Sequence, residues 1–272
     1  MLTTRVGLVD KSGKIAFEEL AKVAAAINLQ VQRDLGPIWN VRATVSALPS
    51  PNQIPAGVWP LFIVGKLPAT EGGFHMTQHN QPYAKVAFGH GWTIAASHET
   101  LEMLVDPSGN RLVASTAIGV SGGSIADVNG KFEYLVEVCD PSEGEKFAYA
   151  IDDVVVSDFY TPNFYDPTAA SGVRYSFTGS IKGPRQVLQA GYLSWLNPVK
   201  NVMQQLRNFE QPEIVDLGPA PPGMSLRAFV DGRTTPTQKL SALPETAESL
   251  VRAAKRGRAL HEWATARAKL YE

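Results

Sequence analysis

Cysteine is nearly absent from this sequence, which holds a single one, Cys139, among 272 residues. One cysteine cannot form an internal disulfide, and it cannot build the paired-cysteine clusters that bind structural zinc. A metal ion would therefore have to be held by histidine and carboxylate side chains. Cysteine poverty is also typical of a reducing compartment.

The sequence also lacks an excess of charge and a long apolar run. Its 25 basic and 26 acidic residues leave a formal net charge of −1, so we expect no nucleic acid and no membrane among its partners. We find no stretch of about 18 apolar residues and no apolar signal-peptide core. These absences predict a cytoplasmic protein.

What is present is an ordinary globular composition, with 44% hydrophobic and 19% charged residues. Hydrophobic periodicity predicts a mixture of strands and helices. We expect strands over residues 5–10, 41–48, 58–67, 132–141 and 148–160. Residues 74–88 read as a polar edge strand kinked at Pro82, because proline cannot donate to a strand ladder. Residues 161–184 read as a loop with strand fragments.

Three helices are expected. The first covers residues 16–35 and is ended by Gly36 and Pro37, and the second runs from Trp92 to Val105 and is closed by Asp106 before Pro107. The third covers about 246–271. The chain is accordingly divided into a main domain, 1–203, and an extension, 204–272, made of a Pro/Gly-rich linker and a C-terminal helix. That amphipathic helix is basic, and its apolar side could bind a protein partner or a second copy of the chain.

The second helix contains the motif HETLE. Positions i and i+4 of a helix share one face, so His98 and Glu102 can reach the same ion. The intervening Glu99 is then placed to accept a proton from the attacking water. The alternative is that HETLE is merely the polar side of an amphipathic helix. A glutamate in place of a second histidine makes the ion a weaker Lewis acid, so a divalent ion other than Zn²⁺ stays open.

Several runs carry a resemblance to a known family. The runs PYAKVAF, SHETLEMLVDP, LVEVCDP and VVVSDFYTPNF resemble a family of bacterial and phage proteins that is more distantly similar to the plant EXORDIUM-type proteins. The resemblance covers roughly residues 5–200. It implies an α/β (α+β) zincin-like metallopeptidase domain, with a mixed sheet and an active-site helix. It also implies that His98 and Glu102 are metal ligands and that Glu99 is the base.

A catalytic zinc needs a third protein ligand. Glu137 and Asp140 match an EIxD motif of the family, and we favour Glu137 as the ligand, with Asp140 as its substitute or supporting neighbour. Asp106 lies eight residues along the helix from His98, a rise of about 12 Å, so it could share the ion only if the helix ended early. We favour a role for it at the helix end or beside the ligands. Cys139 departs from the family motif. Its thiolate could compete for the metal, but a lone cysteine in a strand is more often a small buried apolar group.

The remaining histidines and tyrosines are weaker candidates. His75 and His79 are four apart in a predicted strand, about 13 Å, and are expected to touch substrate rather than share an ion. His90 reads as a loop residue, and His261 lacks a ligand four positions on. Tyr160, with Tyr165 near it, could donate to the oxyanion of a tetrahedral intermediate, although packing is the alternative.

The sequence thus predicts a zinc-dependent metallopeptidase that hydrolyses peptide bonds, with the strand around residues 82–88 docking a peptide or protein substrate. No GxSxG motif is present, and the glycine-rich GVSGGS lacks the lysine of a phosphate-binding loop. The alternative from another class is a non-enzymatic structural or interaction protein, such as a phage or assembly component, that keeps the same fold.

Overall fold

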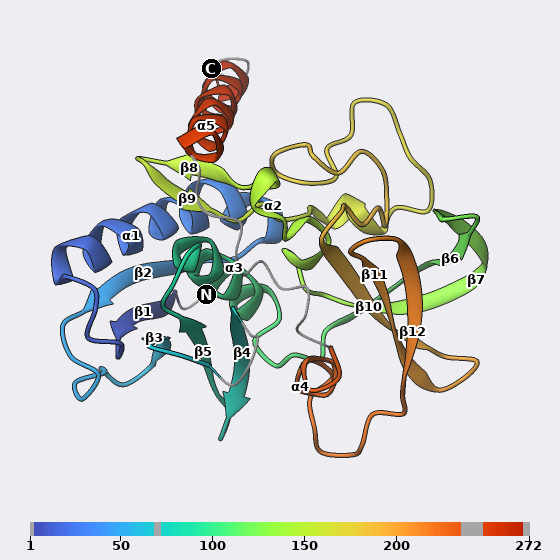
Figure 1. Cartoon of the computed structure of the whole chain (residues 1–272), viewed down its shortest axis with the longest axis horizontal. Coiled ribbons are helices and arrows are strands. Elements are labelled where there is room, and N and C mark those ends of the chain that lie inside the picture. The colour runs from blue at the N-terminus through green and yellow to red at the C-terminus, as the bar shows by residue number, and fades with distance from the viewer. Residues whose placement is uncertain (1–2, 68–71, 235–246, 269–272) are drawn as a thin grey trace.

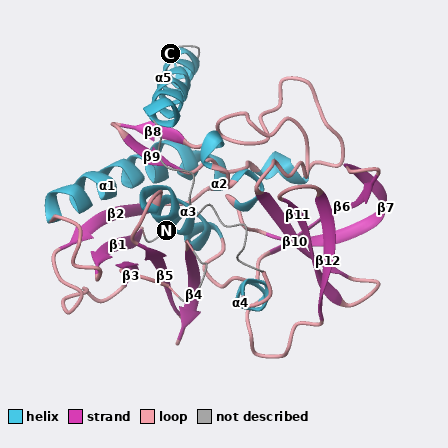
Figure 2. Cartoon of the chain, in the orientation of Figure 1, coloured by secondary structure: helices cyan, strands magenta, loops and turns pink. Residues whose placement is uncertain are grey.

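A computed structural model describes residues 3–67, 72–234 and 247–268 of the chain. These residues form two five-stranded sheets placed side by side, with helices packed over and between them (Figures 1 and 2). The architecture is mixed α/β of the α+β type, as the hydrophobic periodicity predicts.

The first sheet is built by the N-terminal part of the chain and has the order β2-β1-β3-β5-β4. Its strands are β1 (Thr4–Asp10), β2 (Ala43–Leu48), β3 (Val58–Val64), β4 (Gly73–Gln78) and β5 (Gln81–Ala87). Four are parallel and β4 runs antiparallel at the edge. The buried face is apolar at alternate positions of β5, where Ala84 and Val86 have no exposed surface.

The second sheet is antiparallel and has the order β12-β11-β10-β7-β6. It consists of β6 (Leu112–Ser121), β7 (Ser124–Leu135), β10 (Gly191–Asn197), β11 (Val202–Asn208) and β12 (Pro212–Gly218). The predicted boundary at residues 203 and 204 falls inside β11. The start of the predicted extension is therefore not a linker but two paired strands of this sheet.

The first predicted helix is longer than its sequence pattern indicates. It comprises α1 (Phe17–Leu29), a π-helical segment (Gln30–Leu35) and α2 (Gly36–Trp39), and it ends at Asn40 in a left-handed conformation. The prediction that Gly36 and Pro37 end the helix is wrong. A new α-helical segment, α2, begins at Gly36 directly after the π-helical segment, and proline at the start of such a segment needs no hydrogen-bond donor. A side chain at Gly36 would lie 2.8 Å from the carbonyl oxygen of Val41, which accounts for the glycine.

Two predicted single strands are tight hairpins instead. Residues 74–88 fold into β4 and β5 around His79 and Asn80, whose φ angles are 49° and 62°. Residues 148–160 contain β8 (Tyr149–Ile151) and β9 (Val154–Val156), joined by Asp152 and Asp153. The expectation that the strand around residues 82–88 is an edge is wrong, since β5 pairs on both sides and β4 is the edge.

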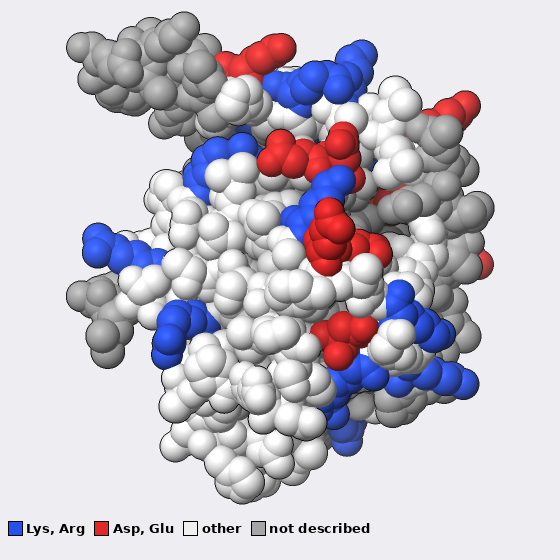
Figure 3. Space-filling model, turned by 90° about the vertical axis from the view of Figure 1, so that its left-hand side faces the viewer, with Lys and Arg blue, Asp and Glu red and all other residues white. Residues whose placement is uncertain are grey.

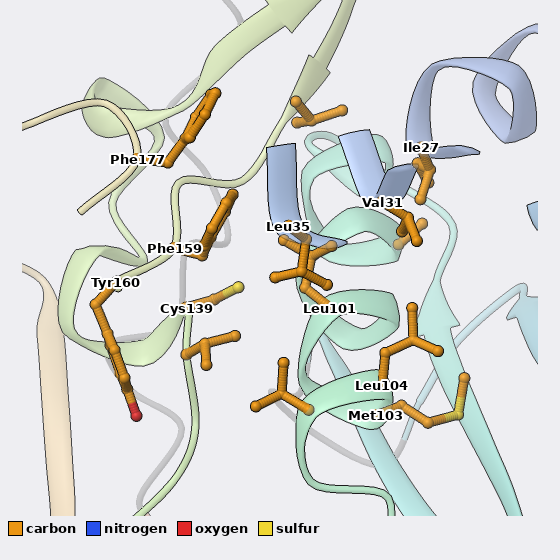
Figure 4. Packing of buried hydrophobic residues seen from close by; sticks show 14 of the residues in the cluster. Ile27, Val31, Leu35, Leu101, Met103, Leu104, Cys139, Phe159, Tyr160 and Phe177 are labelled. Carbon is orange, nitrogen blue, oxygen red and sulfur yellow. The ribbon is translucent and has the colours of Figure 1, made fainter. Parts of the chain in front are cut away.

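Helix α3 (Trp92–Val105) has the predicted bounds and packs on β4 and β5 of the first sheet and on β9 (Figure 1). Leu101 is fully buried in the main core cluster. Ile27, Val31 and Leu35 pack over the helix from one side, and Cys139 and Phe159 lie on the other (Figure 4). Because the helix is covered all round, its polar residues are buried together with its apolar ones. Short 3₁₀ turns follow at Asp140–Ser142, Glu145–Phe147 and Pro162–Tyr165.

The C-terminal part adds two helices. The short α4 (Leu226–Asp231) buries Phe229 and Val230 against Leu135 and Met203 of the second sheet. Helix α5 (Ala247–Ala268) packs on β8 instead, through Ala253 and Leu260. Leu250 and Val251, predicted as part of its apolar side, are 40% and 63% exposed. Predicted helical residues 269–271 lie outside the described residues.

Surface charge is mixed on the face drawn in Figure 3, where basic and acidic groups alternate around a broad uncharged area. No stretch of helix in the described ranges combines the length and apolarity that crossing a bilayer requires.

Candidate metal centre

The last two turns of α3 bring three acid–base side chains into the interior. His98, Glu99 and Glu102 are 5%, 3% and 0% exposed. Burying carboxylates is costly unless a cation or hydrogen bonds compensate them. The surroundings of these side chains should therefore show which compensation is present.

His98 meets two carboxylates through a single nitrogen. Its Nε2 lies 3.1 Å from Oε2 of Glu102 and 3.2 Å from Oδ1 of Asp140. Both oxygens are buried and accept no hydrogen bond within the described part of the chain. Two ligand atoms on a tetrahedral zinc, with bonds of about 2.0 Å, are separated by about 3.3 Å. Each of these two separations is therefore close to the distance between two ligand atoms on one zinc ion.

The second oxygen of each carboxylate is held by the protein. Oε1 of Glu102 accepts the backbone N–H of Cys139 at 3.1 Å. Oδ2 of Asp140 accepts Nη1 of Arg227 at 3.1 Å. Each carboxylate thus has one anchored oxygen and one free oxygen, and both free oxygens face His98. Outer hydrogen bonds of this kind orient metal ligands.

Arg227 is a member of the site that the sequence did not indicate. It belongs to α4, is 3% exposed, and its Nη1 also lies 3.2 Å from Oε2 of Glu137 and 3.6 Å from Oε2 of Glu102. Nε pairs with Asp231 at 2.9 Å. In the sequence, the one sign of a role for Arg227 is its spacing of four residues from Asp231. Because such pairs are common on helix surfaces, this spacing does not predict a buried site.

Glu137, the favoured third ligand, lies past the end of β7 and faces a different set of atoms. Its Oε2 is 3.2 Å from Arg227 and 3.8 Å from Nε2 of His75. Within the described residues, neither of its oxygens has a hydrogen-bond partner. The structure therefore places Asp140, rather than Glu137, against His98.

His75 is also brought into the cluster, although its predicted position was on an edge strand in contact with substrate. It does lie on the edge strand β4, but it is 1% exposed and points toward α3. Its Nδ1 lies 3.4 Å from Oε2 of Glu99 and 3.9 Å from Oε2 of Glu102. His75 thus orients the candidate base.

Cys139 competes with Asp140 as a third donor. Donor atoms of His98, Glu102 and Cys139 all lie within 4.8 Å of one another, as do those of His75, Glu99 and Glu102. Asp140 does not join His98 and Glu102 in such a group, so the free oxygens of Asp140 and Glu102 lie more than 4.8 Å apart. We nevertheless favour Asp140 over Cys139 as the third donor, because its free oxygen lies 3.2 Å from Nε2 of His98. The Cys139 sulfur donates weakly to the His98 carbonyl, and burial raises the pKa of its thiol well above the ordinary value.

The acidic groups differ in their readiness to ionise. Burial opposes ionisation of Glu102, but the charges of His98 and Arg227 outweigh it and lower the pKa of this carboxyl. Burial, with the charge of Glu102, raises the pKa of Asp140 to about 6. Burial raises the pKa of Glu137 well above its ordinary value despite Arg227. Burial thus opposes the charged form of both candidate third ligands, Asp140 and Glu137.

The other predicted residues have different hydrogen-bond and ion-pair partners. Asp106 ends α3 and binds its own loop, accepting the Arg111 N–H at 2.7 Å. The Tyr160 hydroxyl is buried 2.6 Å from that of Tyr165. His79 is in the exposed hairpin turn, and His90 lies 3.6 Å from Glu145. His261 is exposed on α5.

When the chain was compared with protein-family models, curated proteins and solved structures, no match was found. The resemblance to the HExxE family stays a prediction, and the site is interpreted from its own donor atoms.

Proposed function

We propose that this chain is a zinc-dependent peptidase of the HExxE type with a zincin-like fold. The metal would be held by His98, Glu102 and Asp140. The observation that carries the proposal is the pair of buried carboxylate oxygens, without hydrogen-bond partners, that face Nε2 of His98 at 3.1 and 3.2 Å. A nitrogen and two carboxylate oxygens form a donor set that suits zinc.

Zinc held there would polarise a peptide carbonyl and make a water molecule more acidic. The protein must then supply a base that accepts the proton of this water molecule. Glu99 is the candidate base, since it follows the ligand His98 in the sequence and its carboxylate pairs with His75 instead of His98. His75 holds its carboxylate at 3.4 Å, which orients Glu99 toward the sheet.

The substrate backbone would lie along β4, the outer strand of the first sheet. A free strand edge can pair with an extended peptide through main-chain hydrogen bonds. The close approach of Glu99 to Gly73 on this strand supports the choice, because a side chain at Gly73 would lie 2.8 Å from Glu99 Oε1. The base is therefore beside the backbone that would align the substrate.

The test combines metal analysis with one conservative substitution. Purified protein should contain about one equivalent of zinc, and His98→Ala should lose it. Glu99→Gln should keep the zinc but lower the hydrolysis of peptides by about 10²- to 10⁴-fold, the usual contribution of general acid–base catalysis. Metal-free wild-type protein that is indifferent to chelators would refute the proposal.

A non-enzymatic role is the second candidate, and the burial of the site favours it. His98 and Glu99 are only 5% and 3% exposed, so a metal there could serve assembly or stability in a structural or interaction protein, including one of phage origin. The Glu99→Gln variant separates the two. Zinc that is retained while wild-type and variant proteins show the same hydrolysis would indicate a structural ion.

A further inference from the structure

Arg227 is the strongest unexplained feature of the site. It comes from α4, about 87 residues after its hydrogen-bond partner Asp140. Its guanidinium is buried among the carboxylates of Glu102, Glu137 and Asp140. A buried cation at a proposed metal site can do one of two things. It can compete with the metal, or it can hold a ligand in place.

The contacts of Asp140 favour the second role. Its two oxygens are divided between two partners, since Oδ2 accepts Arg227 Nη1 at 3.1 Å and Oδ1 lies 3.2 Å from His98 Nε2. The hydrogen bond to Arg227 thus fixes the rotation of the carboxylate. With that rotation fixed, the free oxygen faces the histidine nitrogen that would share the metal.

The anchoring of α4 also argues against competition. A competing side chain must withdraw when the metal binds. The Arg227 backbone, however, is held to the loop after α3, because its N–H donates a hydrogen bond to the Gly109 carbonyl at 2.9 Å. A side chain at Gly109 would lie 2.8 Å from Cβ of Arg227, so the two backbones are in close contact. Phe229 and Val230 are buried in the same short helix. Asp231 holds the other side of the guanidinium.

We infer that Arg227 is a positioning residue of the metal centre, which orients Asp140 as the third zinc ligand. This inference rests on the proposed metal site. It makes the C-terminal part of the chain a component of that site, although the ligands themselves come from α3 and the turn after β7. It also selects Asp140 over Glu137, because Arg227 leaves Asp140 with one oxygen directed at His98.

The test measures zinc affinity, by competition with a chromophoric chelator, in Arg227→Met and Arg227→Lys proteins. Loss of an outer partner typically weakens metal binding by about 10- to 100-fold. We expect that loss for Arg227→Met and partial recovery for Arg227→Lys, which keeps the charge but not the planar guanidinium. The matched control is Arg185→Met, which removes another buried arginine, paired with Asp127, and should leave zinc affinity unchanged.

A double-mutant cycle separates positioning from a general structural effect. In an Asp140→Asn background, Arg227→Met should weaken zinc binding no further, because the ligand through which it acts is gone. An equal loss in both backgrounds would overturn the inference. So would an Arg227→Met protein that binds zinc as tightly as the wild type or more tightly, since the arginine would then be neutral or a competitor.

Two further measurements keep the outcome clear. The visible spectrum of the cobalt-substituted protein should change in Arg227→Met but not in Arg185→Met. If Arg227→Met does not fold, Asp231→Asn frees one side of the guanidinium and should weaken zinc binding several-fold, while unchanged affinity would count against the inference. Wild-type protein that binds no zinc would refute the proposed function itself. That result differs from wild-type zinc binding that substitution of Arg227 leaves unchanged, which would refute only the inference about Arg227.

Discussion

Two acidic side chains only three positions apart, Glu137 and Asp140, are assigned different roles by their surroundings. Asp140 touches His98, whereas Glu137 touches Arg227 and His75. We therefore predict that Asp140→Asn lowers zinc affinity by more than about 100-fold, beyond the loss of an outer partner. Glu137→Gln should keep most of the zinc. Titration with a chelator measures the zinc affinity of both variants. A larger loss of affinity in Glu137→Gln than in Asp140→Asn would restore Glu137 as the ligand.

A second prediction concerns Gly73, which borders the candidate base. A methyl group there would lie 2.8 Å from Oε1 and 2.9 Å from Cγ of Glu99, closer than side-chain carbons approach other atoms. Gly73→Ala should displace the Glu99 carboxylate and lower kcat while zinc content stays at the wild-type level. The control is Gly72→Ala, because a side chain at Gly72 meets no atom within 4 Å. Equal activity of the two variants would mean that the position of Glu99 is unimportant.

The sequence predicted the part of the site that lies within one helix and the turn after β7. His98, Glu99 and Glu102 follow from helical spacing, and Asp140 was the alternative third ligand. His75 and Arg227 could not be placed in the same way. They reach the cluster from a hairpin strand and a distant short helix, and only the packing of the two sheets brings them together.

At the level of elements, the two missed hairpins share one cause. Both missed hairpins turn on two residues with positive φ that are not glycine, His79 with Asn80 and Asp152 with Asp153. The usual signal for such turns is Asn-Gly or Asp-Gly. Without glycine, the flanking residues read as one continuous strand. Helix α3 was predicted correctly because apolar residues recur along it at Ile94, Leu101 and Leu104 and because Asp106-Pro107 ends it.

The two non-glycine residues of the β8–β9 turn lead to a prediction about the free energy of unfolding. Asp152 and Asp153 have φ angles of 45° and 66°, a strained conformation for side-chain-bearing residues, and both are exposed. Replacing them by Asn and Gly should raise the free energy of unfolding by about 0.5–1 kcal/mol, since this pair suits the turn. Chemical denaturation measures the change. Asp166→Gly is the control, because φ there is −57° and glycine should only destabilise.

At the scale of the whole molecule, the two C-terminal helices have different relations to the site. Helix α4 contributes Arg227 and packs against the second sheet, whereas α5 packs on the β8–β9 hairpin and its neighbouring turn. Gly257 of α5 lies directly against the backbone of Ala150, so this contact is close. The extension thus has two parts. One part, α4, contacts the candidate metal centre, and the other, α5, covers a separate hairpin.

This division predicts the outcome of truncation. A chain ending at Thr234 keeps both sheets and α4, and it should bind zinc with an affinity within about threefold of the full chain. A chain ending at Gly218 keeps both sheets but loses α4, Arg227 and the buried Phe229 and Val230. It should bind zinc at least about 10-fold more weakly, the lower limit for loss of an outer partner. Circular dichroism checks that each chain folds. Weak binding by the chain that ends at Thr234 would show that α5 acts on the site, against the contacts observed.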